Sequence, residues 1–175
     1  MSLTFSRRSF LKYTAVAAVA VAGSSLLTGC KDNPYQPTGT IGDKLSIMGD
    51  FTLLSNPAPT YANNTLTCTL KIECTSKRNL YVIPDCFQVN VYNKDEKLLK
   101  SYSTIALSEY RRDLSKDDDP LTTTMSCTGM DALNEGDIVK VKYWPRAQAS
   151  EGLLGYTEAF ATWSMKFNGT GFDKV

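Results

Sequence analysis

The sequence predicts an all-β domain, a sandwich of two packed sheets with six to seven strands. Apolar and polar residues alternate with period two in several short segments between residues 44 and 168, as strands with one buried face require. Turn residues separate these segments at intervals that suit a sandwich and not an alternation of strands and helices. Hydrophobic residues make up 42% of the chain, which is enough to build a core.

The first residues form an export address. The run SRRSFLK at residues 6–12 resembles the twin-arginine export consensus, with these positions matching: Arg7, Arg8, Phe10, Leu11 and Lys12. A weakly apolar stretch from Ala15 to Leu27 follows. It is shorter than the roughly 20 apolar residues that a membrane-spanning helix needs, so it is typical of a cleaved signal peptide.

The run LTGC at residues 27–30 resembles a lipobox. The resemblance implies that the Cys30 thiol takes a diacylglycerol before the signal peptide is cleaved, and N-acylation would add a third chain. Two acyl chains suffice for stable anchoring, since each buried methylene contributes about 0.8 kcal/mol. We therefore expect an extracytoplasmic protein whose membrane contact is the lipid on Cys30.

Three parts of the chain follow from this reading. Residues 1–29 are the predicted signal peptide, and residues 30–43 are the lipidated Cys30 with a flexible tether. The segment KDNPYQPTGT at residues 31–40 is polar, has two prolines and shows no periodicity. Residues 44–175 are the predicted β-sandwich domain.

The strands of this domain are justified in chain order. Leu45 and Ile47 suggest a first strand, which Gly49-Asp50 breaks before residues 51–53. Residues 65–74 form the clearest strand, because every even position is apolar and every odd position is polar. A polar turn at residues 93–97 follows one further segment, and a Gly-Asp turn at residues 136–137 precedes another. The further segments that suggest strands are residues 87–92, 98–102, 121–127, 139–143 and 161–167. The only helix that periodicity suggests spans residues 105–114.

One pattern carries a family resemblance. FQVNVYNKDEKLL at residues 87–99 is followed by LNEGDIVKVKYWP at residues 133–145. This arrangement resembles the small immunoglobulin-like domains of unknown function on bacterial lipoproteins, although the turn at residues 94–97 lacks their glycine. The resemblance spans residues 44–168 and implies an immunoglobulin-like sandwich and a location, but no activity.

Composition excludes several classes of function. The chain contains no histidine, which removes Ser-His-Asp and Cys-His catalysis and imidazole metal sites. There is no P-loop and no dinucleotide-binding glycine motif. Without residues 1–29 the chain has 16 basic and 18 acidic residues, a net charge of −2, so we expect no nucleic-acid partner.

Four cysteines remain in the predicted domain: Cys68, Cys74, Cys86 and Cys127. Their spacing does not suit a four-thiolate metal site, and two disulfides are expected in an oxidising compartment. A bridge from Cys68 to Cys74 is excluded, because one strand would hold them about 20 Å apart. Cys74–Cys86 with Cys68–Cys127 is favoured over Cys68–Cys86 with Cys74–Cys127. Buried thiols are the alternative.

Other candidate sites are weaker. The acidic run at residues 117–119 could hold calcium, but it lacks the spacing of an EF-hand loop. Glu109 and Asp113 could act as an acid–base pair, although nothing places them across a cleft. Tyrosine is abundant, and tyrosines outside the core suit a recognition surface. Tyr92 is notable, since it stands at a polar-face position of a predicted strand.

These observations favour a non-catalytic binding module of the cell envelope over an enzyme. We expect no catalytic residue, no metal and no cofactor, and a partner that is an envelope protein or polymer. The alternatives are an exported enzyme, hydrolytic or carrying a cofactor, and a structural or assembly factor of the envelope. Twin-arginine export carries folded proteins, which favours the enzyme; the absence of histidine and of any cofactor motif weighs against it.

Overall fold

The computed structural model describes residues 36–47, 51–55, 58–75, 77, 79–149, 152–155 and 160–175, with backbone only at 51–55, 146–149 and 152–155. Nearly all of its regular structure is β. In chain order the strands are β1 (Thr38–Thr40), β2 (Lys44–Ile47), β3 (Phe51–Ser55), β4 (Thr60–Ala62), β5 (Thr65–Cys74), β6 (Leu80–Val82), β7 (Phe87–Tyr92), β8 (Leu98–Tyr102), β9 (Ile105–Leu107), β10 (Arg111–Leu114), β11 (Leu121–Cys127), β12 (Ile138–Tyr143), β13 (Arg146–Ala149), β14 (Gly152–Gly155), β15 (Ala161–Phe167) and β16 (Phe172–Lys174). A single-turn 3-10 helix, η1 (Pro84–Cys86), precedes β7.

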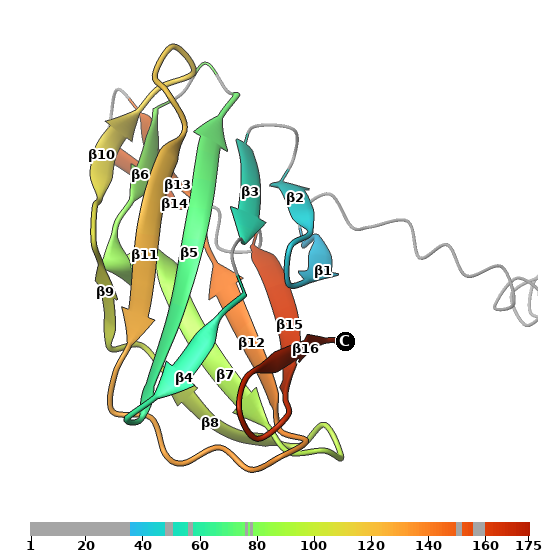
Figure 1. Ribbon diagram of the computed structural model, residues 1–175. Helices are drawn as coiled ribbons and strands as arrows, with labels where there is room; N and C mark the ends of the chain where they lie inside the picture. Colours follow the sequence, from blue (N-terminus) through green and yellow to red (C-terminus); the bar gives the residue numbers. More distant parts are fainter. Residues whose placement is uncertain are drawn as a thin grey trace, which may run out of the picture. The chain divides into compact units, whose positions relative to one another are not determined.

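The strands form three sheets (Figure 1). Sheet A has the order β1-β15-β12-β7-β8, with β16 on β15. Sheet B has the order β2-β3-β5-β11-β9, with β4 on β5, and sheet C is the smaller sheet β10-β6-β13-β14. Figure 1 shows β5 and β11 of sheet B in front of β7, β12 and β15 of sheet A, so sheets A and B are the two layers of a sandwich.

The strand order agrees with the immunoglobulin type of sandwich. In sheet A, β15, β12, β7 and β8 are neighbours in the order of strands G, F, C and C′. In sheet B, β3, β5, β11 and β9 follow the order A, B, E and D. Antibody domains join strands B and F by a disulfide, whereas here Cys68 of β5 and Val141 of β12 line a small apolar cavity.

The core lies between sheets A and B and follows the period-two pattern. In β5 the even positions from Leu66 to Cys74 are buried, and the odd positions are half-buried or exposed. Val89 and Val141 face the core from sheet A, where β7 pairs with β12 in register. Trp163 is also buried, and its indole N–H donates to the Asp43 carbonyl at 3.2 Å. The one-sided alternation therefore places these faces as the sequence predicts.

Two turns fix the entry and exit of the central strands of sheet A. Between β7 and β8, the Asn93 side chain accepts from the backbone N–H groups of Asp95 (3.0 Å) and Lys97 (2.8 Å). Glu96 takes a positive φ of 58° there. Before β12, Gly136 has a φ of 97°, and the buried Asp137 carboxylate accepts from the Asn134 N–H at 2.8 Å. The Gly-Asp turn predicted before β12 is confirmed.

The structure corrects three expectations about elements. The helix predicted over residues 105–114 is wrong: Ile105–Leu107 is β9, paired with β11, and Arg111–Leu114 is β10, paired with β6. Tertiary pairing overrides a helical periodicity carried by three residues. The strands number more than the predicted six to seven, because strands of three or four residues are too short to show alternation. One of them, β1, lies inside the segment predicted as tether.

The two expected disulfides are not formed. Cys68, Cys74, Cys86 and Cys127 are all buried thiols in this structure. Cys68 and Cys127 lie on adjacent strands at diagonal positions, since Cys68 pairs with Met125 and Cys127 with Leu66. A thiol behaves as a small apolar side chain, so these cysteines fill the core without a bridge. The alternative of buried thiols describes the structure.

Within the described part of the chain, no helix has the length and apolar character needed to cross a membrane.

Candidate functional site

The residues predicted to direct export and lipidation, Arg7, Arg8, Phe10, Leu11, Lys12 and Cys30, lie outside the described residues. The four cysteines lie in the core. Burial, followed by the effect of the nearby Cys127, raises the pKa of the Cys68 thiol to about 12. Burial raises the pKa of Cys127 to about 11. Both side chains therefore stay protonated at neutral pH and have the character of packing residues.

The acidic run forms a turn between β10 and β11. The Asp118 carboxylate accepts from the Ser115 N–H at 2.7 Å, and this hydrogen bond lowers the pKa of Asp118. Asp117 forms an exposed ion pair with Lys116 at 3.2 Å. Among the described side chains no group of three metal-binding residues comes together. The run is accounted for by its role in the turn.

Glu109 and Asp113 are exposed. Glu109 lies 3.7 Å from Arg111, carboxylate oxygen to guanidinium nitrogen. Its backbone carbonyl accepts from the buried Thr123 hydroxyl at 2.6 Å. These contacts join β11 to the segment between β9 and β10, so they give Glu109 a structural role.

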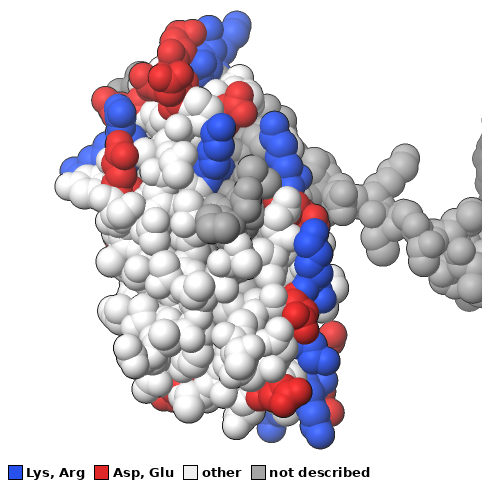
Figure 2. Space-filling view, viewed as in Figure 1, with Lys and Arg blue, Asp and Glu red and all other residues white. Residues whose placement is uncertain are grey.

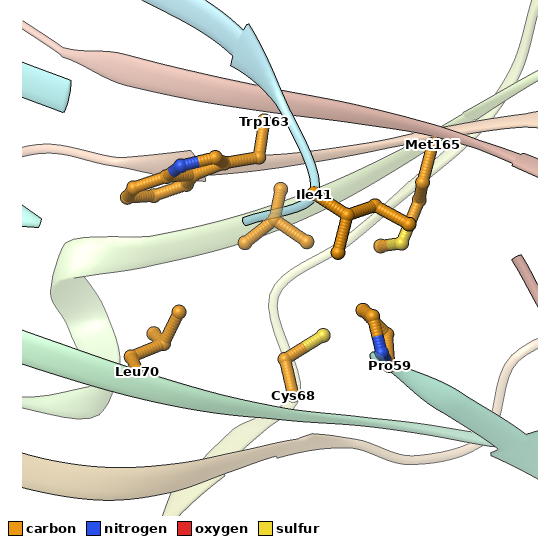
Figure 3. A pocket seen from close by; sticks show the side chains of 7 residues that line it. Ile41, Pro59, Cys68, Leu70, Trp163 and Met165 are labelled. Carbon is orange, nitrogen blue, oxygen red and sulfur yellow. The ribbon is translucent and has the colours of Figure 1, made fainter. Parts of the chain in front are cut away.

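A small apolar cavity lies inside the sandwich (Figure 3). Its volume is about 10 Å³, and it is lined by Ile41, Pro59, Cys68, Leu70, Val141, Trp163 and Met165. Figure 3 shows Trp163, Ile41 and Met165 on one side of it and Leu70 and Cys68 on the other. A space of about one water molecule with no polar lining stays dry. It is a packing defect and not a ligand site.

The outer face of sheet A is the surface where functional groups gather. It consists of the side chains on β7, β12, β15 and β8 that point away from the core. They are Gln88, Asn90, Tyr92, Leu98, Ser101, Ile138, Lys140, Lys142, Trp144, Phe160, Thr162, Ser164 and Lys166. The register places them in rows across the sheet: Lys140, for example, lies opposite Asn90 on β7 and Ser164 on β15.

Two lysines on this face lie against aromatic rings. The Lys140 ammonium is 4.7 Å from the Tyr92 ring centroid. The Lys142 ammonium is 4.7 Å from the Phe160 ring and 5.7 Å from the Trp144 ring. The last two rings pack together with centroids 5.6 Å apart. These cation–π contacts hold both ammonium groups close to the sheet.

A polar side chain without a partner lies at the centre of the face. Asn90 is only 4% exposed, and its side-chain oxygen has no hydrogen-bond donor among the described residues. A buried acceptor left without a donor costs about 1–3 kcal/mol. Such a group is uncommon in a folded protein, and because its oxygen is buried it is not open to a ligand on the face.

The outer face of sheet B is different in character. Figure 2 shows the side on which sheet B lies in front: the middle of its lower half is free of Lys, Arg, Asp and Glu, which stand in the upper part and along the right edge. The outward positions of β5 and β11 there include these residues: Thr65, Thr67, Thr69, Thr122, Thr124 and Ser126. Threonine is a common strand residue, so this face is explained by strand preference alone.

Sequence reasoning found Tyr92 as an aromatic residue on a polar face, but it missed most of this surface. Lys140 and Lys142 were assigned only to the polar side of an alternating strand. Trp144 lies one step past the end of β12, and Phe160 one step before β15. The sequence did contain a signal for Trp144. Side chains two residues apart in a strand lie on the same face, so Trp144 falls on the face of Lys142 if β12 is continued by one residue.

Comparison with known proteins adds the export signal. Residues 4–24 match the family of twin-arginine translocation pathway signal sequences. The chain is therefore exported across the cytoplasmic membrane by this pathway. No curated protein matches the chain.

Among solved structures, the Fcho1 Mu homology domain of Danio rerio with bound Eps15 peptide is similar at 10% identity, with a TM-score of 0.22. The alignment covers 71% of this chain and 50% of the Fcho1 chain. A similarity at this level carries no argument about fold or function, so the function of the domain must be inferred from its own surface.

Proposed function

We propose that the exported protein is a lipid-anchored, non-catalytic binding module that recognises a component of the cell envelope through the outer face of sheet A. The observation that carries this proposal is the pairing of lysines with aromatic rings on one flat face. Aromatic side chains such as Tyr and Trp are enriched where proteins bind partners, and Lys140 and Lys142 give the face its positive charge.

The anchor in this proposal is the lipid on Cys30. The first described strand, β1, begins at Thr38, so about eight residues would separate the lipidated cysteine from the fold. Such a segment spans at most about 28 Å when fully extended. The domain would stay close to the membrane surface, where it would meet envelope components.

Co-sedimentation with the host's own envelope tests the binding role. The exported protein is extracted in detergent and mixed with the insoluble envelope fraction after its lipids have been washed out. We expect the wild type to sediment and the variant Lys140→Gln/Lys142→Gln to lose at least fivefold in the bound fraction. Lys71→Gln, on the outer face of sheet B, is the matched control and should bind as the wild type does.

Equal sedimentation of the wild type and the double variant would overturn the assignment to this face. Stoichiometric metal or a chromophore in the purified protein would instead favour the exported-enzyme alternative. The anchor is tested separately by intact mass: the wild type should carry a diacylglycerol that Cys30→Ala lacks, and an unmodified wild type would contradict the lipid.

A further inference from the structure

We infer that the ligand of the outer face of sheet A is an acidic polysaccharide, a chain of sugar rings bearing carboxylates. This inference rests on the proposed function and adds the chemical class of the ligand. Three properties of the face carry it: its charge, its aromatic rings and the pairing of its backbone.

The charge of the face selects an anion. Lys140 and Lys142 are two residues apart on β12, so their side chains leave the same side of the sheet about 7 Å apart. The outward side chains of β7, β8, β12 and β15 include no carboxylate. No carboxylate pairs with either lysine in the described part of the chain. Two cations with which no described carboxylate pairs attract a ligand with repeated negative charge.

The aromatic rings of the face favour a ligand that has flat, weakly polar surfaces. Tyr92 lies at the level of Ile138 on the neighbouring strand, and Trp144 lies six residues further along the chain. That separation corresponds to about 20 Å along the strand direction. The rings therefore flank the lysines on both sides of an elongated strip. The C–H faces of sugar rings pack against aromatic rings, because the face of the ring carries negative charge.

The groups between the rings suit sugar hydroxyls. Ser164 and Ser101 stand in the same row as Lys140 and Asn90, and they can both donate and accept hydrogen bonds. A ligand with both carboxylates and hydroxyls would satisfy the lysines and the serines together.

The pairing of the backbone argues against an acidic peptide. β12 is hydrogen-bonded to β7 on one side and to β15 on the other, so the backbone groups at the centre of the face are already paired. Extended peptides usually bind by adding a strand to an open edge, and this face offers no edge at the position of the lysines. The face can recognise a ligand only through its side chains.

Three polymers of similar size test the class of the ligand: polygalacturonate, fully methyl-esterified polygalacturonate, and poly-L-glutamate. Binding to the exported protein in detergent is measured by titration calorimetry at low salt. We expect polygalacturonate to bind at least tenfold more tightly than either of the other two. The ester keeps the rings and removes the charge, and the polypeptide keeps the charge and removes the rings.

Variants then place the binding on the face. Lys140→Gln/Lys142→Gln should weaken polygalacturonate binding at least tenfold, and so should Trp144→Ala. The matched controls are Lys71→Gln and Tyr110→Ala, which remove a lysine and an exposed tyrosine elsewhere and should bind as the wild type does. If Trp144→Ala fails to fold, the lysine variant decides alone, since it removes only solvent-accessible charge.

Each remaining outcome overturns the inference. Binding of poly-L-glutamate as tight as that of polygalacturonate would indicate charge recognition or a peptide partner. Tight binding of the esterified polymer would show that the lysines do not select the ligand. If none of the three polymers binds but the protein still sediments with the envelope, the polysaccharide is wrong and the proposed function stands. If envelope binding is also absent, the proposed function itself fails.

Discussion

Cys68 lies in the middle of β5 with its thiol between the two sheets, and burial raises its pKa to about 12. Cys127, diagonal to it on β11, has a pKa of about 11 for the same reason. Tyr143 is buried as well, and its pKa lies well above the ordinary value of 10.0. In all three groups the folded state favours the neutral form, so their effect on stability appears in alkaline solution.

The stability of the domain should fall as pH rises from about 9 to about 12. Below pH 9 the Cys68 thiol is protonated in both the folded and the unfolded state, and its contribution is fully present. Above pH 9 the unfolded chain ionises first, and the contribution is lost as pH rises toward the folded pKa of about 12. For Cys68 the loss is on the order of 2 kcal/mol at pH 11.

Urea denaturation at pH 7 to pH 11 measures this loss. Cys68→Ala should show a smaller decline than the wild type, although Tyr143 and Cys127 keep part of it. A wild-type midpoint that does not move up to pH 11 would contradict the prediction. Thiol counting by alkylation of the unfolded protein is the control, because a Cys68 held in a disulfide would have no thiol to titrate.

Glu96 has an unusual backbone conformation in the turn between β7 and β8. Its φ of 58° is a backbone conformation that glycine adopts without strain and other L-residues adopt at a cost of roughly 1–2 kcal/mol. This turn contains no glycine. The Asn93 side chain compensates by accepting two backbone N–H groups. These hydrogen bonds therefore offset the backbone strain at Glu96, which a glycine at this position would avoid.

Among the elements, β1 shows how a short strand can matter without a sequence pattern. Thr38–Thr40 runs parallel to β15 at the edge of sheet A. The Thr40 hydroxyl donates to the Ser164 carbonyl at 3.0 Å and accepts from the Val175 N–H at 3.0 Å. β1 thus ties the start of the domain to β15 and to the C-terminal residue Val175.

Gly39→Ala should strain β1 and destabilise the domain by about 1 kcal/mol, because two side chains must shift to admit the new Cβ. A Cβ at this position would lie 2.8 Å from the Leu45 side chain and 3.0 Å from the Asp43 carboxylate. Hydrogen exchange should then show faster exchange at Thr40, and the urea midpoint should fall. Gly171→Ala is the matched control, since its Cβ would meet nothing closer than 3.9 Å. Unchanged exchange at Thr40 in Gly39→Ala would contradict the close packing.

At the scale of the whole molecule, the export pathway and the fold belong together. A twin-arginine signal delivers a folded protein across the membrane, and this domain buries an extensive core without a disulfide among its described residues. A domain held together by its core can fold before it is transported.

Changing Arg7 and Arg8 together to lysine should leave uncleaved precursor in the cytoplasm. The pair is read by a receptor, and an ammonium does not replace the planar guanidinium. Fractionation followed by intact mass distinguishes precursor from exported protein. The matched control changes the exposed pair Arg111 and Arg112 of β10 to lysine, which should be exported normally. Export of the signal variant at the normal rate would show that another pathway carries the protein.

The sequence by itself determined the export signal and the class of fold. Alternation in β5, β7, β12 and β15 predicts their buried faces correctly, because a strand with one face in the core must alternate. Tertiary structure decided the features that alternation does not predict. The short strands β1 and β9 exist only through pairing with distant strands, and the cysteines stay thiols because they pack as apolar side chains. The candidate face was also decided in three dimensions, since Tyr92 meets Lys140, and Lys142 meets Phe160, only when β7, β12 and β15 pair in register.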